Sequence, residues 1–214
     1  MPYENKILSA LLKLSAAKDI TVCGIDGLGG AGKSTIAETI RAALEAQGIH
    51  TVLLHIDDFI HRRAVRYNDA VPAWQCYYDL QWRYDYFAEV LRAARSGSTE
   101  QITAELYDKD NDCYISETYA LGKRTVSLTE GIFLQRKELA GLFDYMIYID
   151  IPESVRLARV LRRDTYIGDA KQITEKYETR YFPAERHYAA AYQPALSADL
   201  TITGAAETGR ENPV

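Results

Sequence analysis

Cysteine is scarce in this sequence, and the few cysteines form no pattern that binds a metal or builds disulfides. The 214-residue chain contains three, Cys23, Cys76 and Cys113, which are odd in number and far apart. No Cys-x-x-Cys or Cys/His pair accompanies them, which excludes a disulfide framework and a zinc site. We therefore expect reduced thiols and a cytoplasmic protein.

The sequence also lacks an excess of positive charge and a long apolar run. Lys and Arg number 25 against 30 Asp and Glu, a net charge of −5. This argues against a protein that coats nucleic acid, because neutralising phosphates requires a basic surface. No run approaches the ~20 apolar residues that span a bilayer, and the first residues do not form a secretory signal. We expect neither a nucleic-acid nor a membrane partner, and whether the chain forms a homo-oligomer stays open.

Hydrophobic residues make up 47% of the chain and charged residues 26%, which is ordinary for a globular protein. The length predicts a single domain over residues 1–214. Periodic segments predict helices at 5–17, 33–47 and 79–95. Short apolar and β-branched runs predict buried strands at 20–25, 51–56, 125–129, 145–151 and 198–203. Continuous apolar strands that alternate with helices indicate an α/β fold with a parallel sheet covered on both faces.

Three segments depart from this alternation. Residues 59–124 are rich in Tyr, Trp, Asp and Arg, and we interpret them as an insertion between the second and third core strands. Residues 153–192 are rich in arginine and follow a strand that delivers them to the ligand crevice. The final residues, 204–214, are small, polar and aperiodic, so we expect a loose tail.

The strongest signal is a glycine-rich motif between the first predicted strand and the next helix. It matches the pattern G-x-x-x-x-G-K-[ST] and reads Gly27-Leu28-Gly29-Gly30-Ala31-Gly32-Lys33-Ser34-Thr35. Small residues allow main-chain N–H groups to curl around a polyphosphate, and the helix N-terminus adds positive potential. Lys33 would reach the β- and γ-phosphate oxygens, and the Ser34 hydroxyl would coordinate Mg²⁺. The motif predicts a site for ATP, or another nucleoside triphosphate, with Mg²⁺.

The same glycines also fit the dinucleotide-binding fingerprint G-x-G-x-x-G, with Asp57 at about the distance of its ribose-binding acid. That fingerprint gives no reason for Lys33 followed by Ser34 at the start of a helix, whereas the phosphate loop requires both. The nucleoside-triphosphate interpretation is therefore favoured over an NAD(P)-linked oxidoreductase.

Acidic residues end three of the predicted strands: Asp57 and Asp58, Glu130, and Asp150. The carboxyl ends of parallel strands border the ligand crevice, where an acid can hold Mg²⁺ or accept a proton from an attacking hydroxyl. A helix N-cap or a solvated loop acid is the alternative for each. Asp57 and Asp58 favour a function, because adjacent acids repel each other unless a cation or donor is near. The sequence does not decide which of the two is the base.

In their order along the chain, these and further motifs resemble the uridine kinase family, which belongs with the P-loop nucleoside, pantothenate and phosphoribulose kinases. The resemblance covers residues 20–203. It rests on the phosphate loop and then on Asp57-Asp58-Phe59, Tyr107-Asp108, Glu130-Gly131-Ile132 and Arg156-Leu157-Ala158-Arg159-Val160-Leu161-Arg162-Arg163-Asp164. It implies a three-layer α/β/α sandwich with a five-stranded parallel sheet in the order 2-3-1-4-5. It also implies an acceptor-binding insertion at about 59–124 and a helical lid at about 153–192.

The resemblance implies roles for individual residues. Asp57 corresponds to the acid that takes the proton of the acceptor hydroxyl, and Glu130 to the acid near the Mg²⁺ that Ser34 holds. Lys33, Arg159 and Arg162 would stabilise charge on the moving phosphoryl group. The residues expected to contact the acceptor are Asp57, Phe59, Tyr107 and Asp108, together with His61, which is close to Asp57 in sequence.

The hypothesis is ATP- and Mg²⁺-dependent transfer of the γ-phosphoryl group to a hydroxyl of a small metabolite, a nucleoside by resemblance. Ile60 and Asp112 stand where the family has an aromatic residue and a histidine that recognise the base, so the identity of the acceptor stays open. A kinase of a pantothenate-like alcohol is one alternative. A nucleotide-hydrolysing switch or assembly factor is another, and a solvated basic face is the alternative for the lid arginines.

Overall fold

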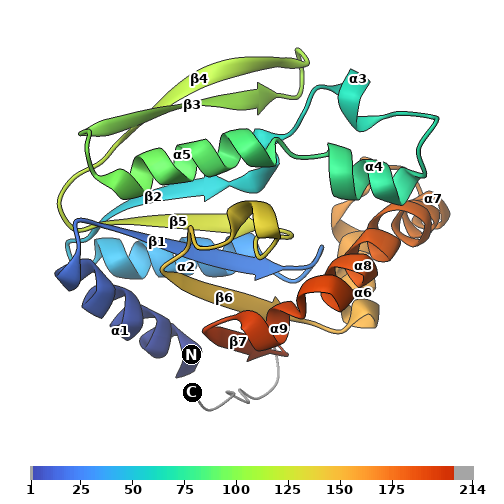
Figure 1. The fold of residues 1–214 in the computed structure, drawn as a ribbon. Helices are drawn as coiled ribbons and strands as arrows, with labels where there is room; N and C mark the ends of the chain where they lie inside the picture. Colours follow the sequence, from blue (N-terminus) through green and yellow to red (C-terminus); the bar gives the residue numbers. More distant parts are fainter. Residues whose placement is uncertain (1, 205–214) are drawn as a thin grey trace.

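The computed structural model describes residues 2–204, and its central feature is a sheet of five parallel strands (Figure 1). The strands are β1 (Ile20–Gly27), β2 (His50–His55), β5 (Thr125–Gly131), β6 (Tyr145–Asp150) and β7 (Leu200–Thr203). Their spatial order is β2-β5-β1-β6-β7, which confirms the predicted order 2-3-1-4-5. Because β1 pairs with both β5 and β6, the loop that follows β1 lies at the middle of the carboxyl edge of the sheet.

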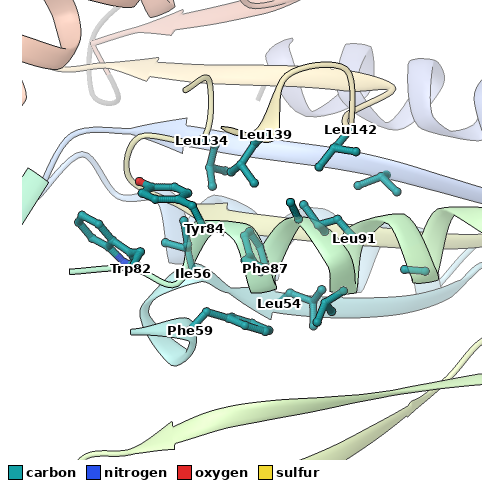
Figure 2. Close-up of a cluster of buried hydrophobic side chains, with 14 of the residues drawn as sticks. Leu54, Ile56, Phe59, Trp82, Tyr84, Phe87, Leu91, Leu134, Leu139 and Leu142 are labelled. Atoms are coloured by element: carbon teal, nitrogen blue, oxygen red, sulfur yellow. The ribbon is translucent and has the colours of Figure 1, made fainter. Parts of the chain in front are cut away.

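Helices cover both faces of this sheet. Successive residues of a strand point to opposite faces, so each strand supplies apolar side chains to both sides. On one face lie α1 (Pro2–Ala17) and α2 (Lys33–Glu45), whose apolar residues share a core with Cys23 of β1. On the other face lies α5 (Tyr84–Ser96), which shares a core with Val22. Figure 2 shows Phe87 and Leu91 of α5 packed beside Leu54 of β2. The three-layer α/β/α sandwich is therefore as predicted.

The insertion between β2 and β5 contains helices and a β-hairpin. After the 3-10 helix η1 (Ile56–Phe59) come α3 (Arg63–Arg66), α4 (Ala73–Leu80) and α5, and then the antiparallel strands β3 (Gln101–Asp108) and β4 (Cys113–Ala120). The hairpin lies across α5 on the side away from the five-stranded sheet (Figure 1). It was not predicted, although buried Ile102, Ala104 and Leu106 alternate with exposed residues as in a strand with one buried face.

The helix predicted at 79–95 is two helices in the structure. Helix α4 ends at Leu80 and α5 begins at Tyr84. Between them, Trp82 forms an isolated antiparallel bridge with Ile60, so the backbone pairs with the chain that leaves η1 instead of continuing the helix. This break brings residues 81–83 beside η1 and its two aspartates.

The chain after β5 passes through η2 (Lys137–Leu139) and β6. It then forms α6 (Glu153–Arg163), α7 (Ala170–Lys176), the π-helical turn η3 (Tyr177–Tyr181), α8 (Phe182–Tyr192) and α9 (Pro194–Ser197). Helices α6, α7 and α8 gather with α4 at the carboxyl edge of the sheet (Figure 1). No helix among residues 2–204 has the length and apolar character to cross a membrane. Of the predicted tail at 204–214, all but Gly204 lies outside the described residues.

Candidate active site

The glycine-rich loop joins the end of β1 to the start of α2 in a tight turn. Gly30 and Gly32 have φ angles of 80° and 99°, a region that favours glycine. A Cβ at Gly30 would lie 2.9 Å from Val160 Cγ1, so a side chain there would collide with α6. Helix α2 begins at Lys33, and no side chain of the described residues caps it. The N–H groups of its first turn are therefore available to an anion.

The buried carboxylate of Asp26, in β1, anchors the start of the loop. It accepts hydrogen bonds from the Gly27 N–H at 2.8 Å, the Tyr188 hydroxyl at 2.5 Å and the Gln135 amide at 3.2 Å. Burial raises the pKa of Asp26, and these three hydrogen bonds oppose the rise. Asp26 was not predicted as a site residue, because a buried acid inside a strand gives no sign in the sequence of the distant groups that meet it.

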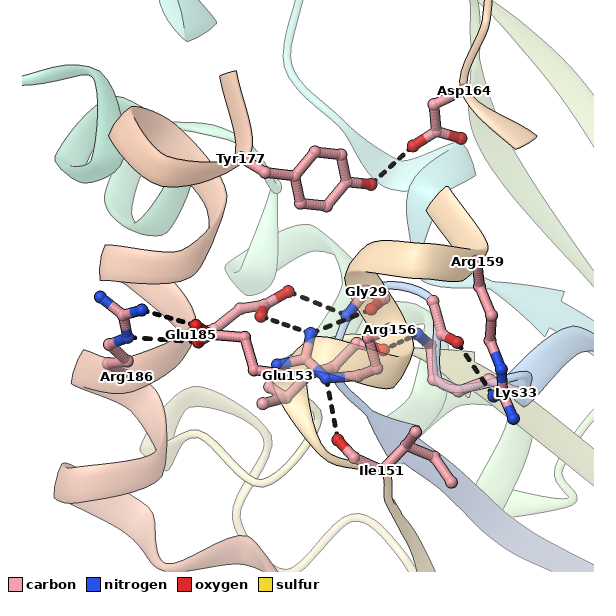
Figure 3. Close-up of polar contacts among 12 residues, drawn as sticks. Gly29, Lys33, Ile151, Glu153, Arg156, Arg159, Asp164, Tyr177, Glu185 and Arg186 are labelled. Atoms are coloured by element: carbon pink, nitrogen blue, oxygen red, sulfur yellow. Dashed lines mark hydrogen bonds and ion pairs between the residues drawn. The ribbon is translucent and has the colours of Figure 1, made fainter. Parts of the chain in front are cut away.

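Two buried side chains from the C-terminal helices hold the middle of the loop (Figure 3). Glu185 of α8 accepts from the Gly29 N–H at 2.9 Å, and Arg156 of α6 donates to the Gly29 carbonyl at 3.0 Å. The two side chains form an ion pair at 2.7 Å, with Arg156 3% and Glu185 1% exposed. Helices α6 and α8, which both lie within the predicted lid, are therefore hydrogen-bonded directly to the loop.

Lys33, Ser34 and Glu130 come together where α2 meets the end of β5. The Lys33 ammonium donates to the Leu28 carbonyl at 3.3 Å, and the Ser34 hydroxyl donates to Glu130 Oε1 at 3.1 Å. His55, the last residue of β2, contacts the same Oε1 through Nδ1 at 2.6 Å. His55 was not predicted at the site. Its position opposite Glu130 follows from the parallel register of β2 and β5, which the sequence alone does not show.

The charged side chains in this cluster shift one another's pKa values. Burial raises the pKa of Glu130, but the hydrogen bond from His55 and the charge of Lys33 outweigh it, so the pKa lies below its ordinary value. The Glu130 hydrogen bond in turn raises the pKa of His55, against the effect of burial. The result is an ionised carboxylate beside the Ser34 hydroxyl. Among residues 2–204, no group of three or more His, Cys, Asp or Glu side chains is arranged to hold a metal ion by itself.

Asp57 lies on η1, immediately after β2, and the break between α4 and α5 supplies its partner. The Trp82 indole N–H donates to Asp57 Oδ1 at 3.2 Å. Burial raises the pKa of Asp57, and the Glu130 charge adds to the rise while Lys33 opposes it. Asp57 lines a cavity with Lys33, and Asp58 does not. The geometry therefore favours Asp57 over Asp58 as the acid that faces a ligand.

Two cavities meet at the phosphate loop. The first has a volume of about 220 Å³, and its lining includes Asp57, Gln81, Asp164, Glu185 and the tyrosines Tyr77, Tyr166, Tyr177 and Tyr181. The second has a volume of about 440 Å³ and is bordered by the loop, the start of α2 and α6. Gly30, Lys33 and Arg163 line both cavities. A ligand in one cavity would therefore face a ligand in the other across two cationic side chains.

The arginines of α6 differ in what they reach. Arg159 Nη1 donates to the Gly30 carbonyl at 3.2 Å and lines the second cavity. Arg162 is exposed, donates to a carbonyl of its own helix, and lies outside both linings. Arg163 lines both cavities, and the buried Asp164 holds its guanidinium at 2.6 Å. In this structure Arg163, and not Arg162, therefore lines the cavities beside the phosphate loop.

The remaining predicted acceptor residues lie outside both cavities. Phe59 is fully buried in the core against Phe87, so its ring lines neither cavity in this structure, unlike the contact expected from the sequence. His61 lines a separate cavity of about 360 Å³. At the end of β3, Tyr107 donates to Asp112 at 2.8 Å, and Asp108 accepts from main-chain N–H groups of the hairpin turn. In this structure the Tyr107-Asp108 pair holds the hairpin turn.

A five-stranded parallel sheet with a phosphate loop after its central strand, and two cavities that share a lysine and an arginine at that loop, define a P-loop phosphotransferase. Comparison with known proteins gives the particular family. The model of the phosphoribulokinase / uridine kinase family matches residues 22–204.

Individual relatives agree with this match. A uridine kinase of Staphylococcus haemolyticus (strain JCSC1435) is 31% identical over 150 residues, which are 68% of this chain and 69% of that protein. The solved structure of a possible uridine kinase from Bacillus stearothermophilus is 30% identical with a TM-score of 0.74, over 94% of this chain and 99% of that chain. A D-glycerate 3-kinase from Cryptococcus neoformans var. grubii shares the fold at 12% identity and a TM-score of 0.70. The chain belongs to the phosphoribulokinase / uridine kinase family and is a phosphotransferase that acts on a hydroxyl group.

Proposed function

We propose that the protein transfers the γ-phosphoryl group of ATP to a hydroxyl of a nucleoside. The observation that carries this proposal is the pair of cavities joined at Gly30, Lys33 and Arg163. The larger cavity borders the phosphate loop and would take the nucleotide. The smaller contains Asp57 and would take the acceptor. Phosphoryl transfer needs this arrangement, because its loose transition state is stabilised mainly by positioning and by positive charge between donor and acceptor.

On the donor side, main-chain N–H groups and Lys33 would hold the phosphates, and Arg163 would face the group in transfer. The residues present fit Mg²⁺: Ser34 and the ionised Glu130 offer hard oxygen ligands 3.1 Å apart. Mg²⁺ keeps several waters and usually binds one or two carboxylates together with substrate phosphates, so a full set of protein ligands is not required. When bound, the ion would neutralise charge on the β- and γ-phosphates.

On the acceptor side, Asp57 would accept a hydrogen bond from the attacking hydroxyl and take its proton late in the reaction. Its Trp82 hydrogen bond fixes the carboxylate, and the nearby Lys33 charge favours the ionised form. In a loose transition state the acid need not be a strong base, since orienting the hydroxyl supplies most of the effect.

The charges of the smaller cavity support a neutral acceptor. Of the cations among its described lining residues, Arg163 is already paired with Asp164, and Lys33 belongs to the phosphate loop. Glu185 is paired with Arg156 behind the loop. An acceptor that carries a carboxylate or a phosphate would find no separate cation there and would face Asp57. A nucleoside carries no such charge, and the two relatives named above at 31% and 30% identity are a uridine kinase and a possible uridine kinase.

The test is ADP release from ATP with and without a panel of hydroxyl metabolites: nucleosides, pantothenate-like alcohols and sugar phosphates. The proposal predicts a low basal rate that nucleosides raise and sugar phosphates do not. ADP release that no acceptor changes, but that a protein partner raises, would instead indicate a nucleotide-dependent switch. Stimulation by the charged acceptors alone would support a kinase activity but contradict a nucleoside as its acceptor.

A further inference from the structure

Gln81 lines the smaller cavity, here called the acceptor cavity, and its side chain is held in one orientation by a buried arginine. Gln81 follows the last residue of α4, at the break before α5. Arg180, on the π-helical turn η3, donates from Nη2 to Gln81 Oε1 at 3.3 Å and from Nη1 to the Ala73 carbonyl at 3.2 Å. Arg180 is 6% exposed and stacks on the rings of Tyr67 and Tyr77 at 4.9 and 5.5 Å. The arginine is therefore fixed from several sides.

This contact determines which end of the amide a ligand meets. A guanidinium has only donors, so the atom of Gln81 that faces Arg180 must be the carbonyl oxygen. The amide nitrogen then stays on the other side of the group with two N–H donors. Within the described residues it has no protein acceptor. The end of the Gln81 amide left free for a ligand is therefore the donor, because Arg180 engages its carbonyl oxygen.

The walls around Gln81 are flat and aromatic. Tyr77 packs edge-on against Tyr181 with ring centroids 4.7 Å apart, and Tyr181 packs in the same way against Tyr177. All three line the cavity, and Tyr177 and Tyr181 lie on the π-helical turn, a type of helix that is frequent at functional sites. Tyr166, 80% exposed, stands at the same cavity with no core to pack into. Aromatic walls of this kind can pack against a planar ring.

We propose that Gln81 sets the specificity of this cavity by donating from its amide nitrogen to one ring carbonyl oxygen of the acceptor, the carbonyl that a cytosine-type base replaces by an amino group. Arg180 is the positioning residue that keeps the donor turned toward the ligand. The inference rests on the proposed nucleoside acceptor and narrows it to a carbonyl-bearing base of the uracil type. A cytosine-type base carries an amino group in place of that carbonyl. Its N–H donors would then face the N–H donors of Gln81, and neither group would find an acceptor.

The experiment compares kcat/KM for uridine and cytidine at saturating ATP, in the wild type and in two variants. Gln81→Glu replaces the donor by an acceptor of the same shape, while Arg180→Met frees the amide to rotate. We expect the wild type to prefer uridine by about tenfold, the worth of one hydrogen bond to a neutral group. Gln81→Glu should reverse the preference, and Arg180→Met should bring the ratio close to one. The KM for ATP should not change in either variant.

The matched control is Gln101→Glu, the same change of charge at the exposed start of β3, which should leave the ratio unchanged. A wild type that does not distinguish the two nucleosides overturns the inference and leaves the kinase proposal standing. An equal loss for both nucleosides in Gln81→Glu also overturns it, since Gln81 would then contact a part common to both, such as the ribose. If the wild type phosphorylates no nucleoside but accepts another alcohol, the proposed function fails and this inference fails with it.

Discussion

Removing the Glu185 carboxylate tests how strongly the phosphate loop depends on the buried Arg156–Glu185 pair. In Glu185→Ala the Arg156 guanidinium, 3% exposed, loses its counter-charge, and the Gly29 N–H loses its acceptor. Breaking a buried ion pair from one side costs about 3–5 kcal/mol, because the remaining charge stays out of water. For a protein of this size that corresponds to a fall in melting temperature of roughly 6–20 °C. Chemical and thermal denaturation followed by circular dichroism measures both.

Two further variants distinguish the effect of losing this ion pair from a general destabilisation of α8. The neighbouring ion pair Arg186–Glu153 is equally close, at 2.6 Å, but its side chains are 65% and 37% exposed, so Glu153→Ala should cost less than about 1 kcal/mol. The double variant Arg156→Met with Glu185→Leu should recover most of the loss, since apolar side chains can replace a buried pair at little cost. If Glu185→Ala is no less stable than Glu153→Ala, the buried Arg156–Glu185 pair does not stabilise the protein as expected.

Three other predictions concern the site itself. Lys33→Ala should lower kcat by about 10²–10³, since one fixed charge on the transferred group is lost, and normal turnover in this variant would refute the phosphate-loop assignment. Asp57→Asn should lower kcat by about 10²–10⁴ with the KM for ATP kept; a collapse of ATP affinity with kcat intact would place Asp57 in the nucleotide site instead. The Glu130 hydrogen bond raises the pKa of His55 above 6.5. The stability that this gives is therefore full below about pH 6.5 and is lost as the pH rises through the raised pKa. Free energies of unfolding at about pH 6 and about pH 9 should differ less in His55→Gln than in the wild type, and an equal difference would contradict the role of the pair.

The sheet and the phosphate loop could be predicted because their signals are local. A β-branched run, then small residues, then Lys33 and Ser34 at the start of a helix describe one continuous segment, and the structure has β1, the loop and α2 there. The hairpin β3–β4 also had a local signal, the alternation of Ile102, Ala104 and Leu106, which the aromatic and charged composition of the insertion concealed. The break at Trp82 had no such signal, because it depends on pairing with Ile60.

Site residues were harder to predict where a role depends on distant contacts. Arg162 and Arg163 are neighbours in sequence, but only the position of α6 over the loop shows that Arg163 lines both cavities. His55 meets Glu130 through strand register, and Gln81 meets Arg180 across 99 residues of chain. Phe59 follows the two aspartates in sequence, yet the turn of η1 carries its ring into the core. Neighbours in sequence can therefore point in different directions, because each residue of a helix is rotated relative to the one before it.

We expect the two joined cavities to pass a phosphoryl group from ATP to an acceptor hydroxyl. This transfer is measured by incubating the protein with Mg²⁺, ATP labelled in the γ-phosphate and a nucleoside, and then separating the products. The label should appear in a nucleoside monophosphate, one for each ADP formed. Label released only as inorganic phosphate, at a rate that no acceptor alters, would contradict it.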